Sequence, residues 1–396
     1  MLRCLRFGLL FCLPGIVAAA PTVVASPADV LVSLEKVNRY FMGKFPDPGQ
    51  PIVTRAKANE SGRNGFVTRP SNIWTRGVYY EGLMALYAID RDPRDYDYAV
   101  RWGEAHHWEL RGTRSGRLDR SADDQCCGQT YLDLYGYDPK PERIRALQAD
   151  IEGLLSDPGT ADWWWCDALQ MAMPVYAKLG VLTGDARYFE KMYALYDDAK
   201  TRQAGHGLYN PAEHLWWRDR TFVPPYREPN GRNCYWARGN GWVFAALARV
   251  LAILPANAPH RGEYVRTFRE MAGALLAAQR HDGFWNVSLA DPSDFGGKEV
   301  TGTALFTYGF AAGIRQGLLP SVTYAPAAAR AWDAMVRDAV HPDGFLGYVQ
   351  GTGKQPSDSQ PVGYDGTPDF EDFGIGCFLL AGAEIWHLSG GAVSSP

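Results

Sequence analysis

A glycine turn that leads directly into aromatic residues recurs along this chain. It occurs at Gly205-His206-Gly207-Leu208-Tyr209, at Asp282-Gly283-Phe284-Trp285 and at Asp343-Gly344-Phe345-Leu346-Gly347-Tyr348. Each copy follows a segment whose apolar residues have the spacing of an amphipathic helix, and segments with strand-like alternation are scarce. Helical hairpins joined by similar turns predict a closed ring of helix pairs, with an open helical solenoid as the competing arrangement.

Helical periodicity covers most of the chain. The predicted helices are residues 28–44, 75–89, 96–110, 125–135, 141–155, 164–182, 186–202, 237–254, 262–279, 303–316, 325–340 and 373–388. Paired in order and closed into a ring, these segments form an all-α (α/α)6 barrel, a six-hairpin toroid. A closed ring leaves a funnel at one end, where loops and helix starts present side chains. We therefore predict a single (α/α)6-barrel domain over residues 26–396.

Charge and aromatic content limit the partners of such a barrel. The 396 residues carry a formal net charge of −4 at pH 7, which argues against a surface that wraps nucleic acid. The chain contains 13 Trp, 21 Tyr and 17 Phe. Exposed aromatic side chains lower solubility, so many of these residues are expected in a core or a cleft. We expect no nucleic-acid partner.

The first residues have the pattern of a secretory signal peptide. Arg3 and Arg6 form a basic start, an apolar run follows over residues 7–17, and Val23-Val24-Ala25 precedes Ser26 as a cleavage site. The apolar run is too short for a membrane-spanning helix. We predict that residues 1–25 are a signal peptide and that the protein is periplasmic or secreted, without a membrane partner.

Metal and cofactor chemistry has no signature in the sequence. Five cysteines follow the predicted signal peptide at irregular spacing and without a Cys-x-x-Cys pair, which argues against a zinc site. His106 and His107 are adjacent, a spacing that does not place two ligands on one helix face. The chain lacks a GxSxG elbow, a Walker loop, a dinucleotide fingerprint and an HExxH motif. We expect no metal and no cofactor.

Two groups of carboxylates lie at the starts of predicted helices. Asp167 follows Trp163-Trp164-Trp165, and Asp123-Asp124 opens another helical segment. Indole faces stack on sugar rings, and apolar walls raise the pKa of a carboxyl so that it holds a proton near neutral pH. The alternative is that these aspartates cap helix N-termini, where the helix dipole favours negative charge. Paired acids at the open end of a helical barrel indicate general acid/base chemistry on a sugar, with Trp165 as a candidate stacking surface.

A third segment joins a cation to aromatic residues. Arg238 lies between Trp236 and Trp242. A guanidinium held against an aromatic floor can bind a carboxylate with two hydrogen bonds, although a surface cation–π contact gives the same pattern. His206 and His214, in the loop before this segment, are candidates for contacts with substrate hydroxyls, or else they are structural.

The ordered motifs resemble glycoside hydrolase family 105, the unsaturated rhamnogalacturonyl hydrolases, which are close relatives of the unsaturated glucuronyl hydrolases. The matching segments are residues 74–83, 122–131, 163–174, 236–242, 301–306 and 374–382, so the resemblance covers nearly the whole mature chain. It implies an (α/α)6 barrel, in agreement with the helix pattern. It also implies an oligosaccharide partner and catalysis without a cofactor, and we expect a monomer or a weak dimer.

The resemblance further implies a substrate and a reaction. Polysaccharide lyases leave a 4,5-unsaturated uronic acid at the non-reducing end of each fragment, and family members remove it by hydrating the C4=C5 double bond. The family's acid/base maps to Asp167, and its second functional aspartate maps to Asp124, with Asp123 as the other register. Substrate contacts of the family map to Trp236, Arg238, Trp242, Tyr80 or the adjacent Tyr79, and His206 or His214.

Two alternatives to this interpretation stay open. In the first alternative, the substrate is not the favoured rhamnogalacturonan type but an unsaturated glucuronyl end from glycosaminoglycan, ulvan or arabinogalactan breakdown. In the second alternative, the chain is a non-catalytic sugar-binding protein on the same barrel. Retention of both groups of acids speaks against the second alternative. Loss of the ultraviolet absorbance of the unsaturated sugar distinguishes an enzyme from a lectin.

Overall fold

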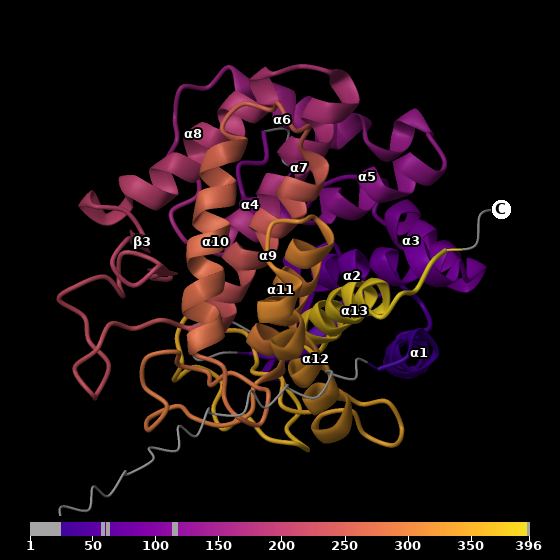
Figure 1. The fold of residues 1–396 in the computed structure, drawn as a ribbon. Coiled ribbons are helices and arrows are strands. Elements are labelled where there is room, and N and C mark those ends of the chain that lie inside the picture. Colours follow the sequence, from indigo (N-terminus) through magenta and orange to yellow (C-terminus); the bar gives the residue numbers. More distant parts are fainter. Residues whose placement is uncertain (1–24, 57–59, 61–63, 113–117, 394–396) are drawn as a thin grey trace, which may run out of the picture.

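The fold is a ring of helices arranged in two concentric layers (Figure 1). A computed structural model describes residues 25–56, 60, 64–112 and 118–393, so the predicted signal peptide lies outside the described residues except for its last position. The inner layer consists of α2 (Trp74–Asp90), α5 (Cys127–Tyr137), α7 (Ala168–Thr183), α9 (Ala237–Ile253), α11 (Val300–Arg315) and α13 (Asp372–Leu388). Each inner helix packs on the next, and α13 packs back on α2. This closed order confirms the predicted (α/α)6 barrel.

An outer layer surrounds the inner helices. It consists of α1 (Pro27–Lys44), α3 (Pro93–Ala105), α6 (Arg145–Leu155), α8 (Arg187–Thr201), α10 (Arg261–Ala277) and α12 (Ser321–Asp338). The outer helices bury one face and expose the other, whereas α9, α11 and α13 are buried nearly all round. Figure 1 shows α1 and α13 lying side by side although they come from opposite ends of the sequence.

Glycines allow the backbones of α2 and α13 to approach closely where the ring closes. A Cβ atom at Gly82 would lie 2.4 Å from the carbonyl oxygen of Gly376, and one at Gly376 would lie 2.2 Å from the carbonyl oxygen of Val78. Neither position has room for a larger side chain, because the opposing atoms are backbone. This contact, which we call the seam, therefore depends on glycine from both helices.

The recurring glycine turns connect each hairpin to its neighbour. Gly283 has a φ of +99°, and a Cβ there would lie 2.5 Å from the carbonyl oxygen of Arg330 on α12. Gly344 has the same φ, and its Cβ would lie 2.5 Å from the carbonyl oxygen of Lys36 on α1. The turn after α12 thus docks on α1, which is the arrangement of a closed ring and not of an open solenoid.

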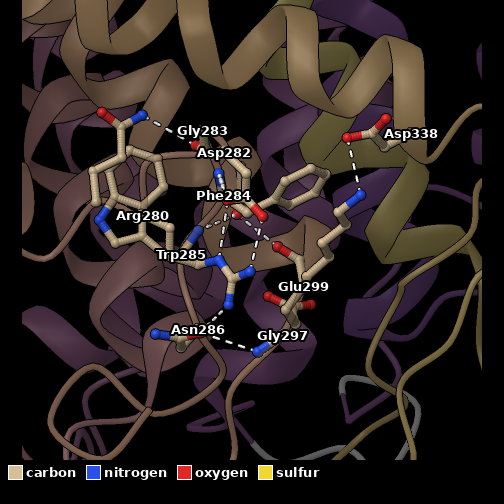
Figure 2. A network of polar contacts seen from close by, with 12 residues as sticks. Arg280, Asp282, Gly283, Phe284, Trp285, Asn286, Gly297, Glu299 and Asp338 are labelled. Atoms are coloured by element: carbon tan, nitrogen blue, oxygen red, sulfur yellow. Dashed lines mark hydrogen bonds and ion pairs between the residues drawn. The ribbon is translucent and has the colours of Figure 1, made fainter.

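Side chains hold these turns in shape, as Figure 2 shows for the turn after α10. The guanidinium of Arg280 binds both carboxylate oxygens of Asp282, at 3.0 and 2.8 Å, and also binds Asn286. The amide of Phe284 donates to the same aspartate at 3.2 Å. Asp282 therefore fixes the turn that brings Gly283 against α12.

The structure differs from the predicted helices mainly at their ends and in short strands. The predicted helix over 125–135 is divided into α4 (Ala122–Gln125) and α5, and the predicted helix over 141–155 begins as the 3-10 helix η2 (Pro141–Arg143). The predicted helix over 96–110 ends at Ala105, because His107 and Trp108 have positive φ angles of 57° and 60°.

Five further short elements of the described residues were not predicted. They are the antiparallel pair β1 (Ile52–Arg55) and β2 (Phe66–Arg69), the 3-10 helix η3 (Gln203–Gly205), and the antiparallel pair β3 (Tyr209–Asn210) and β4 (Leu215–Trp216). The pair β3–β4 matters for the site because the segment that follows it, Arg218-Asp219, pairs with Trp165-Cys166 just before α7. Among the helices that the structure describes, none is long and apolar enough to cross a bilayer.

Candidate active site

A pocket opens at the N-terminal ends of the inner helices. Its volume is about 710 Å³, within the range of small-molecule sites. Its walls are aromatic and charged, and they consist of Trp74, Asp123, Trp165, Asp167, Met171, Arg218, Trp236, Arg238, Trp242, Thr352, Gly353, Lys354, Asp358 and Ser359. The structure thus brings together residues from α2, α4, α7 and α9 with two long loops, as expected for the funnel of a barrel.

Asp167 lies at the start of α7 and faces the pocket. Its side chain makes no capping hydrogen bond to the helix, so the capping interpretation does not hold for it. Instead its Oδ2 accepts a hydrogen bond from Nε of Arg218 at 2.8 Å. Burial raises the pKa of Asp167, and the positive charges of Arg218 and Arg238 oppose that rise.

Arg218 reaches Asp167 because two chain segments pair locally. A β-bridge joins Trp165 to Asp219, and the amide of Cys166 donates to the carbonyl of Arg218 at 2.8 Å. Asp219 then accepts from Nη1 of Arg218 at 2.8 Å. The segment that follows β4 therefore places the guanidinium of Arg218 beside the carboxyl of Asp167 at the start of α7.

Asp123 is the second carboxyl of the pocket. It lies in α4, whose N-cap is Ser121 and not an aspartate. No hydrogen bond or ion pair joins its carboxyl to a residue within the described ranges. Burial and the nearby negative charge of Asp167 raise the pKa of Asp123 to about 7. A carboxyl of this kind can hold a proton near neutral pH.

Asp124 points away from the pocket and pairs with Arg111 at 3.1 Å. Burial is the main cause that raises its pKa to about 6. Successive residues of a helix point in directions about 100° apart, so only one of two adjacent aspartates can face the funnel. The structure therefore places Asp123, and not the preferred Asp124, in the pocket lining, which makes Asp123 the better candidate for the second functional aspartate.

Tryptophans form the apolar walls. Trp165, Trp236 and Trp242 line the pocket as predicted, and Trp74 joins them. The rings of Trp74 and Trp242 meet edge to face with centroids 6.4 Å apart. Trp164 lies beside Trp165 with its side chain half exposed, and it is not part of the lining. The indoles around the carboxyls provide stacking faces for sugar rings.

Arg238 lines the pocket, but its guanidinium donates its hydrogen bonds to a loop. Its Nη1 and Nη2 donate to the carbonyls of Gln350 and Gly351 at 2.6 and 2.7 Å. Its guanidinium lies between the rings of Trp236 and Phe373, 4.5 and 4.9 Å from their centroids. Burial lowers the pKa of this guanidinium. Arg238 thus anchors the rim of the pocket, and a direct contact with a substrate carboxylate stays a prediction.

The rim loop over residues 350–360 is folded around one buried glutamine. The Nε2 atom of Gln350 donates to the carbonyls of Pro356 and Asp358 at 3.2 and 2.7 Å, and its Oε1 accepts from Trp236 at 2.9 Å. This arrangement holds the exposed side chains of Lys354 and Ser359 at the pocket mouth. Lys354 adds a positive charge to the outer wall.

Three predicted contact residues lie away from the pocket lining. Tyr80 is buried in the core, where its ring stacks on Trp102 with centroids 4.1 Å apart, and the adjacent Tyr79 is buried beside it. His214 bonds the hydroxyl of Tyr209 at 3.1 Å, and His206 packs on the edge of an indole. Neither histidine belongs to the pocket lining, whereas Arg218 from the same loop does.

Sequence reasoning missed Arg218, Trp74 and Met171 as lining residues. A signal existed for Arg218, since it follows two tryptophans and precedes an aspartate, as a guanidinium held between an aromatic ring and a carboxylate would.

An (α/α)6 barrel with two carboxyls among tryptophans in its funnel suits an enzyme that acts on sugars. The sequence pattern of glycosyl hydrolase family 88 matches residues 33–389, and the chain belongs to this family. The expected relationship to the unsaturated uronyl hydrolases of families 105 and 88 is thereby confirmed.

Individual relatives agree with the family. An unsaturated 3S-rhamnoglycuronyl hydrolase of Formosa agariphila is 32% identical over 343 residues, which cover 82% of this chain and 86% of the relative. The structure of a glycosyl hydrolase family 88 protein from Bacteroides vulgatus is 31% identical, with a TM-score of 0.81 over 92% of this chain and 99% of that one. A structure described as a polysaccharide lyase is 32% identical, with a TM-score of 0.81 over 94% of this chain and 100% of that one.

Proposed function

We propose that this enzyme removes a 4,5-unsaturated uronic acid from the non-reducing end of oligosaccharides that polysaccharide lyases release. The observation that carries the proposal is the pair Asp123 and Asp167 in one tryptophan-lined pocket, one carboxyl without a partner among the described residues and the other bound to Arg218. A sugar that is planar around C4, C5 and the ring oxygen fits between indole faces. Arg218 and Lys354 supply positive charge for its carboxylate.

The chemistry needs one proton donor and one proton acceptor. The C4=C5 bond and the ring oxygen form an enol ether, so protonation at C4 leaves positive charge shared by C5 and the ring oxygen. Water adds to C5 as a carboxylate takes its proton. The resulting hemiketal opens and expels the rest of the oligosaccharide. Two carboxyls with different environments can supply both steps without a metal or a cofactor.

The sugar next to the unsaturated uronyl group is proposed to be rhamnose. The relative named as an unsaturated 3S-rhamnoglycuronyl hydrolase matches more than four-fifths of the chain, which supports a rhamnose-linked unsaturated uronide. Rhamnogalacturonan-type fragments share that feature. Glucuronyl fragments of glycosaminoglycan, ulvan or arabinogalactan origin are the comparison substrates, and the charged rim with Lys354 and Asp358 is where they would be distinguished.

The test is a spectrophotometric assay on a panel of lyase products in excess chelator. We expect loss of the ultraviolet absorbance of the unsaturated sugar, and no turnover of saturated glucuronides or galacturonides. In heavy-oxygen water the label should enter C5 of the keto product. Label at the anomeric carbon of the released sugar would instead mean direct glycoside hydrolysis and would overturn the proposed mechanism.

A second candidate activity is β-elimination. The similar structure described as a polysaccharide lyase supports it, since it covers nearly the whole chain at 32% identity. The same assay separates the two activities, because a lyase creates the unsaturated chromophore from a saturated polysaccharide and a hydratase consumes it. Increasing absorbance on an intact polysaccharide, with no loss on lyase products, would favour elimination.

Export and assembly are proposed from the sequence. A signal peptide over residues 1–25 would direct the enzyme to the periplasm or the medium, and N-terminal sequencing of the mature protein tests this. We propose a monomer or weak dimer, which light scattering over a range of concentrations would check.

A further inference from the structure

A second pocket lies where the end of α1 meets the starts of α2 and α13. Its volume is about 280 Å³, close to the lower end of the usual range of small-molecule sites, so it has room for one sugar ring. Phe41, Lys44 and Phe45 form its α1 side, and the rest consists of β1, Arg76 and residues 367–372. We call this cavity the α1 pocket.

One pair of residues separates the α1 pocket from the active-site pocket. Asp369 lines the α1 pocket and Thr352 lines the active-site pocket. The amide of Thr352 donates to Oδ1 of Asp369 at 2.7 Å. Of the residues that the structure describes, none belongs to both linings. The two pockets are therefore neighbouring but separate cavities at the same end of the barrel.

Arg76 forms a buried part of the α1 pocket. Its side chain is 1% exposed, and its guanidinium lies 4.9 and 4.7 Å from the ring centroids of Phe41 and Phe45. Its Nε donates to Oδ2 of Asp372 at 3.2 Å. Its Nη1 is buried and has no hydrogen-bond partner among the described residues. A buried N–H without an acceptor is unfavourable, so this atom indicates a missing partner.

Glu371 has the complementary deficiency. Its Oε1 binds Nζ of Lys44 at 2.8 Å. Its Oε2 is buried and lacks a donor within the described ranges. Arg76 and Glu371 both line the α1 pocket, which thus has one unmatched donor and one unmatched acceptor in its walls.

Charge limits the ligand that can supply the missing partners. The lining contains two cations, Lys44 and Arg76, and three acids, Asp369, Glu371 and Asp372. An anion would add to this excess of negative charge, and the described residues contain no group of acids, histidines or cysteines that could hold a metal ion. A hydroxyl both donates and accepts, so the neighbouring hydroxyls of a neutral sugar match Nη1 and Oε2 together.

Apolar surface for a sugar ring lies beside these polar atoms. Phe45 and Pro368 are half-buried lining residues, and Ile52 from β1 joins them. Aromatic and aliphatic walls pack on the C–H face of a pyranose, while its hydroxyls point to polar atoms at the edge. The α1 pocket combines both kinds of contact.

We propose that the α1 pocket is a second carbohydrate site, which binds one neutral sugar residue through its hydroxyls, with Arg76 as donor and Glu371 as acceptor. The sugar belongs either to the distal part of a substrate bound in the active site or to a separate saccharide chain. The proposal goes beyond the proposed function, because this site takes a saturated sugar and performs no chemistry.

The binding test uses methyl α-L-rhamnoside, a saturated neutral sugar, observed by saturation-transfer NMR. Thr367→Trp places an indole in the α1 pocket from an exposed position and should reduce the signal more than twofold. Thr323→Trp, at an exposed threonine of α12, is the matched control and should keep the wild-type signal. Melting temperatures near wild type show that both variants are folded.

A second variant tests the polar contact. Arg76→Lys keeps a positive charge for Asp372 but removes the Nη1 donor, so it should weaken rhamnoside binding severalfold. If it fails to fold, Thr367→Trp still decides the question. An unchanged rhamnoside signal in Thr367→Trp would show that the α1 pocket holds only water and would overturn the proposal. Displacement of the rhamnoside by inorganic sulfate would mean an anion site and would overturn it as well.

Kinetics then separate the two sources of the sugar. If it belongs to the bound substrate, Thr367→Trp should raise KM about fivefold for unsaturated tetrasaccharides and leave KM for disaccharides unchanged. If it belongs to a separate chain, both KM values stay at wild type while the NMR signal falls. Because the rhamnoside is saturated, an enzyme that leaves unsaturated uronides intact would refute the proposed function without altering the NMR result.

Discussion

The two ends of the inner ring contain the same kinds of residue in different states of pairing. At the pocket end, Asp167 is paired with Arg218 but Asp123 is left with a raised pKa of about 7. At the opposite end, the buried carboxylate of Glu81 is fully engaged. It accepts from Arg249, from Nε2 of Gln170 at 2.8 Å and from Sγ of Cys126 at 3.2 Å.

Two more ion pairs complete the opposite end. Lys178 donates to Asp133 at 2.5 Å, and Arg315 binds both oxygens of Glu384 at 2.7 and 2.6 Å. Each of these acids has a cation directly beside it. A buried ion pair that is satisfied serves the fold, whereas a buried acid without a partner is available for chemistry. Among these acids, Asp123 differs from Glu81, Asp133 and Glu384 in having no ion-pair partner within the described ranges.

The largest expected effect is a loss of stability when the buried ion pair between Glu81 and Arg249 loses its cation. Arg249→Met leaves the buried Glu81 without its cation, and loss of one partner of a buried pair typically costs about 3–5 kcal/mol of unfolding free energy. Denaturant unfolding measures this loss. The double variant Glu81→Gln/Arg249→Met should recover much of it, with kcat per folded molecule close to wild type. A double variant less stable than the single one would contradict the pairing argument.

The next effect concerns the pocket end. Asp167→Asn should keep the fold and lower kcat by roughly a hundredfold or more, because the variant cannot accept a proton. Asp124→Asn is the matched control, since Asp124 lies in the same cluster as Asp123 but outside the pocket, and its kcat should stay near wild type. Steady-state kinetics with an unsaturated disaccharide measure both. Near-normal turnover by Asp167→Asn would remove Asp167 from the mechanism.

A smaller effect should follow from changes at Arg238, which joins the pocket to its rim. Arg238→Lys cannot reach both carbonyls, so it loses about one charged hydrogen bond, worth roughly 1.4 kcal/mol or a tenfold rise in KM. Arg238→Ala should raise KM further. Limited proteolysis should also cut residues 350–360 faster in both variants. An unchanged KM together with unchanged proteolysis would refute the anchoring role.

The smallest expected effect lies just outside the pocket. Trp164 is 50% exposed and packs against Trp165, with the guanidinium of Arg218 5.7 Å from its ring. Trp164→Ala should raise KM about fivefold, roughly 1 kcal/mol, for unsaturated tetrasaccharides and leave disaccharides unaffected, because only longer chains reach it. Val322→Ala, an exposed residue on α12, is the control. Equal losses for both substrate lengths would place Trp164 in the binding of the terminal sugar instead.

The architecture was predictable because helices and turns leave local signals. The apolar spacing of residues 237–254 predicted α9 to within a residue at each end, and the Asp-Gly-Phe turns predicted a ring. The hairpin β3–β4 was not predictable, since it consists of two-residue strands with too little length for an alternating pattern. Its position depends on contacts with residues distant in sequence.

The site was predictable in composition but not in orientation. Asp167, Trp165, Trp236, Arg238 and Trp242 were named from their neighbours and line the pocket. The choice between two adjacent aspartates depends on how a four-residue helix is rotated about its axis, which no local pattern encodes. In the same way, the loop before α9 contains His206, His214 and Arg218 as candidates. Only its pairing with Trp165 and Cys166, just before α7, places Arg218 in the pocket.

The seam between α2 and α13 has a consequence for how the chain folds. Gly82 and Gly376 are about 300 residues apart, so the ring is completed by one of the most non-local contacts in the molecule. During synthesis, α2 is made early, and its apolar face stays uncovered until its partner α13 is made near the end of the chain. An unfinished ring exposes that face and is prone to aggregation, so the speed at which α13 arrives sets how long the nascent chain is vulnerable.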